Sequence, residues 1–274
     1  AAPVQVSYIG YLGTMGAGYI DYLLADEVLI PEGSRKHYTE KITYLSSYQV
    51  NDSKRRIADK VFTRAECGLP ESGFVYCCFN NTYKITPKTF DGWMRILGQV
   101  PGSVLWLFEE NPKAAENLRR EAASRGVDAG RLIFGKRLPV AEYLARYRVA
   151  DLFLDTLPYN AGTTASDALW AGLPVLTLRG ESFASRMAAS LLTAIGLPEL
   201  ITSGQKEYEA LAVELALDPE KLRATREKLE RNRLTTRLFD TGRFTRNIEA
   251  AYRAMYERYQ EGLPPDHLFI ERIT

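Results

Sequence analysis

Short apolar runs alternate with longer segments of helical periodicity between residues 74 and 217. Such runs are typical of strands buried on both faces of a parallel sheet, and the periodic segments predict the helices that cover those faces. The expected strands are FVYCCFN, SVLWLF, RLIFG, DLFLDT, PVLTL and a short ELI, and the expected helices cover residues 87–100, 112–125, 140–150, 164–171, 182–196 and 206–217. The pattern predicts an α/β fold with one complete, doubly wound parallel sheet in residues 73–242.

The first fifty residues follow a different pattern. The segments VQVSYIGYLGT, YIDYLLADEVLI and EKITYLSS are rich in strand-forming residues, but no long helix separates them, so residues 1–50 are interpreted as the tail of another domain. Residues 51–72 are polar and mixed, which is typical of a connector. Near the end, apolar residues at positions 248, 251 or 252, 255 and 259 predict a helix that packs back onto the other domain, so residues 243–274 are interpreted as a crossover helix and tail.

Composition limits the classes of function. The 274 residues are 46% hydrophobic and 25% charged, with a formal net charge of +1, which gives no general field for nucleic acid or anionic lipid. No apolar run approaches the roughly 20 residues that span a bilayer, and the opening residues lack a signal-peptide pattern, so a cytoplasmic protein is expected. The basic segment KLRATREKLERNR predicts a solvated surface helix, and a nucleic-acid module built on it is an alternative.

The candidate metal ligands are few. They are Cys67, Cys77, Cys78, His37 and His267. Buried reduced thiols are the expected state of the cysteines, and two histidines with an odd set of cysteines do not assemble into a zinc site. A metal-dependent hydrolase using Asp151 and Asp155 is a further alternative, because strand alternation would point both at one face, but no histidine or third carboxylate joins them.

The segment DLFLDTLPYNAGTTASDALWAGLPVLTL, residues 151–178, predicts a strand, a loop, a short helix and a second strand. In open parallel sheets, ligands bind at the carboxyl ends of the strands, where this loop opens. The first-turn amides of a helix have no internal partner and carry partial positive charge, so Thr163, Thr164 and their neighbours would attract a diphosphate. Asp167, one turn further along, can accept a hydrogen bond from a ribose hydroxyl. An ordinary capped turn is the alternative interpretation of the same letters.

Two further segments carry candidate ligand contacts. Lys84 follows the strand FVYCCFN, so its ammonium would lie at the same edge of the sheet and can reach a phosphate. Tyr143 and Arg146 lie about one turn apart on a predicted helix and face the same way, so they could supply an aromatic edge and a guanidinium to a base or ribose. A surface lysine and a solvated helix face are the competing interpretations.

The segments CFNNTYKITP, SVLWLF, LDTLPYNAGTTASDALWAGLPVLT, GESFASRMAAS and PPDHLF together resemble the C-terminal catalytic region of bacterial-type O-linked N-acetylglucosamine transferases, glycosyltransferase family 41. The opening VSYIGYLGTMGAGYIDYLLAD resembles the last stretch of that family's N-terminal catalytic half. The resemblance implies a GT-B fold, in which two Rossmann-like halves face each other across a cleft. It also implies inverting transfer of N-acetylglucosamine from UDP-GlcNAc to serine or threonine hydroxyls of proteins, with no metal or other cofactor.

The resemblance implies roles for single residues. Lys84 matches the lysine that contacts the donor diphosphate, and it is the implied catalytic residue. Thr163 and Thr164 match paired threonines at the phosphates, and Asp167 matches the acid at the ribose. The implied UDP-sugar-binding residues are Asn81, Lys84, Leu138, Tyr143, Arg146, Asn160, Gly162, Thr163, Thr164 and Asp167.

The uridine side of the implied site contains departures from the family pattern. Arg146 matches an arginine beside the uridine pocket, and the main chain near Leu138 lies where a backbone group reads uracil. The departures are Asn81, Gly162, Tyr143, Val140 and Leu12. Asn81 replaces a glutamine, whereas Gly162 and Tyr143 stand where histidine is common, so the choice of donor sugar stays open.

The family's N-terminal catalytic half begins well before this sequence does, and tetratricopeptide repeats are not found in it. The chain is therefore interpreted as an incomplete catalytic region. Its expected partners are a UDP-sugar, an acceptor protein or peptide, and the N-terminal half or repeat region, with neither nucleic acid nor membrane. A UDP-sugar-binding fragment without transferase activity of its own is the alternative.

Overall fold

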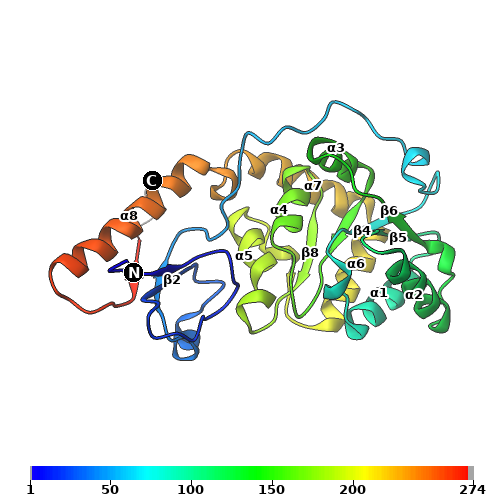
Figure 1. Cartoon of the computed structure of the whole chain (residues 1–274). Helices are drawn as coiled ribbons and strands as arrows, with labels where there is room; N and C mark the ends of the chain where they lie inside the picture. Colours follow the sequence, from blue (N-terminus) through cyan, green and yellow to red (C-terminus); the bar gives the residue numbers. More distant parts are fainter. Residues whose placement is uncertain (1, 271–274) are drawn as a thin grey trace.

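The computed structural model describes residues 2–270, which form a large lobe and a small lobe (Figure 1). The large lobe is built on a six-stranded sheet with the order β6-β5-β4-β7-β8-β9, and every neighbouring pair is parallel. Its strands are β4 (Val75–Cys78), β5 (Val104–Phe108), β6 (Leu132–Gly135), β7 (Leu152–Leu154), β8 (Val175–Leu178) and β9 (Ile201–Thr202). The predicted complete parallel sheet is confirmed.

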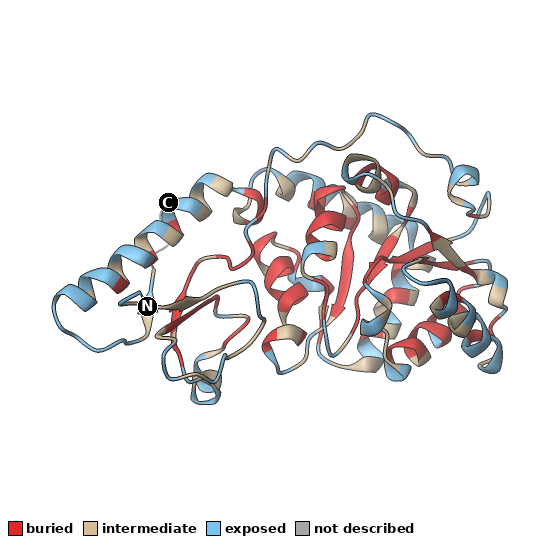
Figure 2. Ribbon diagram, viewed as in Figure 1, coloured by how far each residue is buried: buried red, intermediate tan, exposed pale blue. Residues whose placement is uncertain are grey.

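Helices connect these strands and cover the sheet. They are α1 (Pro87–Gln99), α2 (Pro112–Ser124), α3 (Val140–Arg146), α4 (Thr163–Trp170), α5 (Met187–Ala194), α6 (Gln205–Leu217) and α7 (Pro219–Arg233). The first of them begins where Thr86 accepts a hydrogen bond from the Thr89 amide and Pro87 fills the first helical position, which needs no amide donor. All residues of β4 and β7 are buried, as expected for strands covered on both faces (Figure 2).

Chain order reverses in the middle of the large sheet. The chain runs outward from β4 through β5 to β6, returns to place β7 on the other side of β4, and continues through β8 to β9. Tyr76 of β4 pairs with Leu105 of β5 on one side and with Leu152 of β7 on the other. The two loops that leave β4 and β7 therefore diverge at their carboxyl ends, and this is where open α/β sheets bind ligands.

The small lobe contains a second parallel sheet with the order β1-β2-β3-β10. Its strands are β1 (Val6–Ser7), β2 (Tyr22–Ala25), β3 (Lys41–Tyr44) and β10 (Leu268–Phe269). The strand-rich character predicted for the first fifty residues is confirmed. The fourth strand comes from the opposite end of the described chain, and His267 beside it accepts a hydrogen bond of 2.9 Å from the Ile42 amide through Nδ1.

The last helix, α8 (Thr241–Gln260), lies along the small lobe (Figure 1). Ala251 and Met255 are buried in one cluster with Tyr22 and Leu24 of β2, so the prediction that this helix packs onto the other domain is confirmed. The expectation that position 259 belongs to the buried stripe is wrong. Tyr259 is 47% exposed, and it lines an open hollow together with Tyr22 and Met255.

The segment of residues 51–72 contains only one short 3-10 helix, Ala65–Cys67, and arches over α3 and α4 before the chain enters β4 (Figure 1). It is attached along its path, since the Ala58 amide donates to the Ala141 carbonyl at 2.9 Å. This segment therefore contacts the large lobe as well as linking it to the small one.

Candidate functional site

A buried carboxylate marks the carboxyl end of β7. Asp155 Oδ1 accepts hydrogen bonds from the amides of Thr156 at 2.8 Å and Ala161 at 2.7 Å, and Oδ2 accepts from the Thr177 hydroxyl at 2.7 Å. Burial raises the pKa of Asp155 to about 6, although these hydrogen bonds and the nearby Lys84 oppose the rise. Asp155 therefore holds the loop after β7 in a fixed shape.

Asn80, at the carboxyl end of β4, joins that loop to α4. Its amide nitrogen donates to Thr156 Oγ1 at 2.8 Å, and its side-chain carbonyl accepts the hydrogen bond donated by the Thr164 hydroxyl. Because Asn80 is buried, these bonds exchange little with water. The side chain braces three elements of the sheet edge, and it commits the Thr164 hydroxyl proton to a protein partner.

Lys84 crosses from the loop after β4 to the loop after β7. Its ammonium donates to the Asn160 carbonyl at 3.0 Å and lies 4.0 Å from the centre of the Tyr159 ring. Desolvation lowers the pKa of Lys84, while the nearby Asp155 opposes the change. The Asn160 carbonyl accepts from one N–H donor of the half-buried Lys84 ammonium, so further donors remain for an anion.

The helix α4 begins three residues after Asn160, whose carbonyl accepts the hydrogen bond from Lys84. Gly162 is the N-cap residue and makes no side-chain cap hydrogen bond, because it has no side chain. Thr163 is exposed and Thr164 is half-buried at the first turn, while Asn160, two residues before the cap, is fully buried. The first-turn amides and the ammonium of Lys84 therefore flank one short stretch of loop, where an anion would meet both.

A cavity of about 220 Å³ opens beside the carboxyl ends of β4, β5 and β6. Its lining includes Phe79, Asn81, Phe108, Leu138, Tyr143 and Asp167. Four of these were predicted to contact a UDP-sugar, and the aromatic residues provide apolar walls of the kind that ligand sites use. The structure thus brings Asn81, Leu138, Tyr143 and Asp167 to one hollow next to α4.

Arg146 lies behind the wall of this cavity and not in its lining. The guanidinium is 4.3 Å from the centre of the Phe79 ring and 5.4 Å from that of Tyr143, and Nη1 donates to the Lys136 carbonyl at 2.5 Å. Burial lowers the pKa of Arg146. It faces the same way as Tyr143, as predicted, and it fixes the segment that leads to Leu138.

Asp167 is held by a residue that sequence patterns did not single out. Arg55, in the segment that arches over α4, forms a hydrogen-bonded ion pair with the Asp167 carboxylate. Burial raises the pKa of Asp167, and the charge and hydrogen bond of Arg55 oppose that rise. Asn80 and Arg55 were missed as site residues, because their partners lie far away in sequence and no local motif marks them, whereas Asp155 was considered only for a metal-dependent hydrolase.

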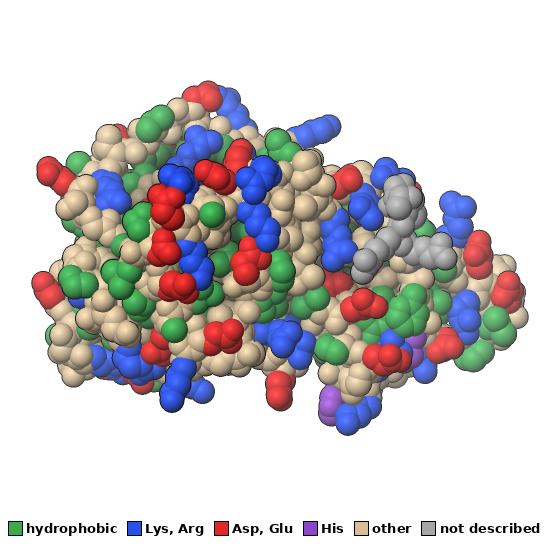
Figure 3. Space-filling model, turned by 180° about the vertical axis from the view of Figure 1, so that it is seen from behind, with side chains coloured by type: hydrophobic (Ala, Val, Ile, Leu, Met, Phe, Trp, Pro, Cys, Tyr) green, Lys and Arg blue, Asp and Glu red, His purple; other side chains and the backbone are tan. Residues whose placement is uncertain are grey.

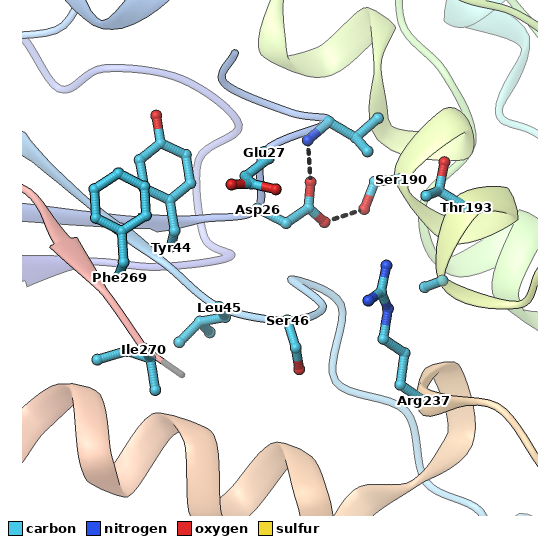
Figure 4. A pocket seen from close by; sticks show the side chains of 12 residues that line it. Asp26, Glu27, Tyr44, Leu45, Ser46, Ser190, Thr193, Arg237, Phe269 and Ile270 are labelled. Atoms are coloured by element: carbon cyan, nitrogen blue, oxygen red, sulfur yellow. Dashed lines mark hydrogen bonds between the residues drawn. The ribbon is translucent and has the colours of Figure 1, made fainter. Parts of the chain in front are cut away.

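The two lobes meet at a second cavity of about 300 Å³ (Figure 4). Asp26, directly after β2, accepts hydrogen bonds from the Ser190 hydroxyl of α5 and from the Leu29 amide at 2.9 Å. Burial raises the pKa of Asp26. Arg237 extends toward the same space from the opposite side in Figure 4. The hydrogen bond between Ser190 and Asp26 thus fixes the small lobe against α5 of the large lobe.

The alternatives based on metal and nucleic acid find little support. Asp151 and Asp155 lie just outside opposite ends of β7, so they do not combine into one site, and Asp151 pairs with Arg226 at 3.0 Å. Within residues 2–270, no group of three metal-ligating side chains gathers. Figure 3 shows acidic and basic side chains interspersed over the back of the molecule. No helix in the described part of the chain is long and apolar enough to cross a membrane.

Comparisons with known proteins show the family and the fold class of the chain. A family model described as glycosyl transferase family 41 matches residues 1–59 and 53–248. SEC of Arabidopsis thaliana, described as a probable UDP-N-acetylglucosamine–peptide N-acetylglucosaminyltransferase, is 41% identical over 273 residues. That match covers 97% of this chain but 28% of the relative, so the chain spans less than a third of that protein.

Solved structures give the same result. A variant of the O-GlcNAc transferase of Thermobaculum terrenum matches with a TM-score of 0.81 and 36% identity, over 93% of this chain and 48% of that one. Sucrose-phosphate synthase of Thermosynechococcus elongatus matches in fold alone, with a TM-score of 0.62 and 16% identity over 87% of this chain and 59% of that one. The predicted GT-B-type α/β class is confirmed. The chain belongs to glycosyltransferase family 41.

Proposed function

We propose that this chain is the donor-binding portion of a protein O-glycosyltransferase that uses UDP-GlcNAc. The observation that carries the proposal is the position of the Lys84 ammonium, 3.0 Å from the Asn160 carbonyl and beside the uncapped amino end of α4. A cation and a set of helix amides at one loop form a site for a diphosphate. The adjoining cavity supplies a place for the nucleoside.

The proposed roles follow the geometry. Lys84 and the amides of Thr163 and Thr164 bind the diphosphate, and Asp167 accepts a hydrogen bond from the ribose. The uracil enters the cavity beside Leu138, with Tyr143 and Asn81 on its walls. Arg146 supports that wall, Gly162 leaves the first turn open, and Asn160 places its carbonyl under the ammonium.

The proposed reaction is inverting transfer. A serine or threonine hydroxyl of the acceptor attacks the anomeric carbon and gives up its proton to water, the bond to the diphosphate breaks, and UDP leaves with the electron pair. Lys84 and the helix amides stabilise the negative charge that develops on the leaving diphosphate, which is the kind of electrostatic stabilisation that contributes most to catalysis. Cations and amides of the protein can provide this stabilisation without a metal.

A second function is supported by the extent of the chain. It spans 28% of the Arabidopsis relative, and within residues 2–270 the small lobe has four strands, two of which are two residues long. A chain that binds the donor but does not position an acceptor would bind UDP-GlcNAc without transferring the sugar. This is the UDP-sugar-binding alternative.

Two assays separate these functions. Calorimetry with UDP measures donor binding, and mass spectrometry of a serine-containing peptide incubated with UDP-GlcNAc measures transfer. Sugar transfer that is lost in Lys84→Met supports the transferase. UDP binding without transfer supports the binding alternative, and failure to bind UDP contradicts both.

A further inference from the structure

The segment that follows β3 runs along α4 and is fastened to it at successive positions. The Ser166 hydroxyl donates to Asn51 Oδ1, Arg55 pairs with Asp167, and Trp170 Nε1 donates to the Arg55 carbonyl at 3.1 Å. The contacted residues of α4 therefore run from Ser166 to Trp170, which is about one helical turn. We call residues 49–55 the strap, because they tie the small lobe to the helix that carries the proposed ribose acid.

Arg55 makes the contact of the strap that is closest to the proposed ligand. Its partner Asp167 lines the 220 Å³ cavity, and the side chains of Arg55 and Asp167 are only 21% and 11% exposed. An ion pair shielded in this way is stronger and better ordered than a surface pair. Asp167 Oδ1 is occupied by the guanidinium, so the second carboxylate oxygen is the one left to accept from a ligand.

Two donors of Arg55 have no partner. Nε and Nη2 are buried, and within residues 2–270 no hydrogen-bond acceptor is found for either. The cavity lining does not include Arg55, so these donors do not face the ligand space, and Arg55 can act on a nucleotide only through Asp167.

We propose that Arg55 is a positioning residue for the ribose of the donor nucleotide, acting through its ion pair with Asp167. This inference rests on the proposed function, because it assumes that UDP occupies the site. Arg55 orients the carboxylate and balances its charge, so that Asp167 accepts a ribose hydroxyl in one geometry. The strap thereby makes the connector part of the donor site.

The test compares UDP with its 2′-deoxy and 3′-deoxy analogues by calorimetry. The parent chain is expected to bind UDP about tenfold more tightly than one of the two analogues, as for loss of a hydrogen bond to a charged group. Arg55→Met is expected to lower the affinity for UDP to the affinity that the parent chain has for this analogue. The affinity for the analogue itself is expected to change less than twofold. Asp167→Asn is expected to give the same pattern, and the double variant no further loss.

Arg56→Met is the matched control, because Arg56 is the next residue, is exposed, and pairs only with the exposed Asp59 in the described chain. Arg56→Met is expected to prefer UDP over the deoxy analogue by the same factor as the parent chain does. Thermal melting of every variant reports folding. If Arg55→Met does not fold, Arg55→Lys decides instead, since it keeps the charge but loses the planar fork and is expected to reduce the preference.

The possible failures are distinguishable. A parent chain that does not bind UDP overturns the proposed function and this inference with it. A parent that prefers UDP while Arg55→Met, or Arg55→Lys if needed, keeps that preference overturns the inference alone. An equal loss for all three ligands in a folded Arg55→Met chain also overturns it, because a purely structural role would weaken every ligand alike.

Discussion

The Lys84 ammonium donates a hydrogen bond of 3.0 Å to the main-chain carbonyl of Asn160, and this bond joins the loops that leave β4 and β7. These are the two loops that diverge where the strand order reverses. The cation is thus positioned at the ligand-binding edge of the sheet by the fold itself. Its proximity to the amino end of α4 is the relationship on which the proposed donor site depends.

We expect Asn80 and Thr164 to act as a unit in nucleotide binding. The Thr164 hydroxyl donates to Asn80 Oδ1, so removing either side chain frees the first turn of α4 from the same brace. Calorimetry with UDP on Asn80→Ala, Thr164→Val and the double variant should give a coupling free energy of about 1 kcal/mol.

The matching control pairs Asn80→Ala with Thr163→Val. Thr163 is exposed, and its substitution should add to that of Asn80 within about 0.5 kcal/mol. If the effects of Asn80→Ala and Thr164→Val were also additive, the Thr164 hydroxyl would point to the ligand and not to Asn80.

Asp155 should make folding stability depend on pH in the direction opposite to that of a carboxylate whose pKa is lowered on folding. Its pKa is about 6 in the folded chain, above the value of 3.8 for a free aspartate. The folded state therefore binds the proton more tightly, and the stabilisation present below pH 3.8 is lost as the pH rises through about 6. Asp155→Asn should remove this loss, which amounts to at most about 1.4 kcal/mol per pH unit.

Urea unfolding between pH 4 and pH 7 measures this difference. Asn keeps the shape of the side chain, and the Thr177 hydroxyl can rotate to accept from its amide. Asp59→Asn is the control, since the Asp59 side chain is 95% exposed. Parallel stability curves for the parent and Asp155→Asn would mean that Asp155 is not a titrating group in this range.

Arg146 is expected to contribute to binding of the nucleoside and not to binding of the diphosphate. Arg146→Met keeps most of the packing against Phe79 and should cost less than about 1.5 kcal/mol in unfolding free energy. It removes the hydrogen bond to the Lys136 carbonyl, so the wall near Leu138 loosens. UDP affinity should fall about fivefold, equivalent to about 1 kcal/mol, while pyrophosphate affinity stays the same. Equal losses for the two ligands would place Arg146 at the phosphates.

The sequence predicted the large sheet and the start of α4 because both depend on local signals. Short apolar runs such as VYCC favour buried strands between two covered faces, and the two threonines after the Gly/Pro/Asn loop mark a helix start. The same signals predicted that Lys84 and Thr164 lie at one edge of the sheet, since the carboxyl ends of parallel strands meet at that edge.

The bracing contacts were not predictable in this way. Arg55 and Asp167 are 112 residues apart in sequence, and Asn80 and Thr164 are 84 apart. Each pair depends on how the segments pack, and an arginine in a polar connector looks like any solvated arginine. Strand β10 was missed for a similar reason, because two residues carry no periodicity and pairing with β3 depends on the path of α8.

The affinity of UDP for the parent chain and for Lys84→Met, measured by calorimetry, decides whether Lys84 belongs to a diphosphate site. Lys88→Met, an exposed lysine four residues away, serves as the control. Loss of a charge-assisted phosphate contact is expected to cost about 1.5 to 3 kcal/mol, or about 10 to 150-fold in affinity. This loss is expected for Lys84→Met, and no loss is expected for Lys88→Met. Equal UDP affinity of the parent and Lys84→Met would contradict that expectation.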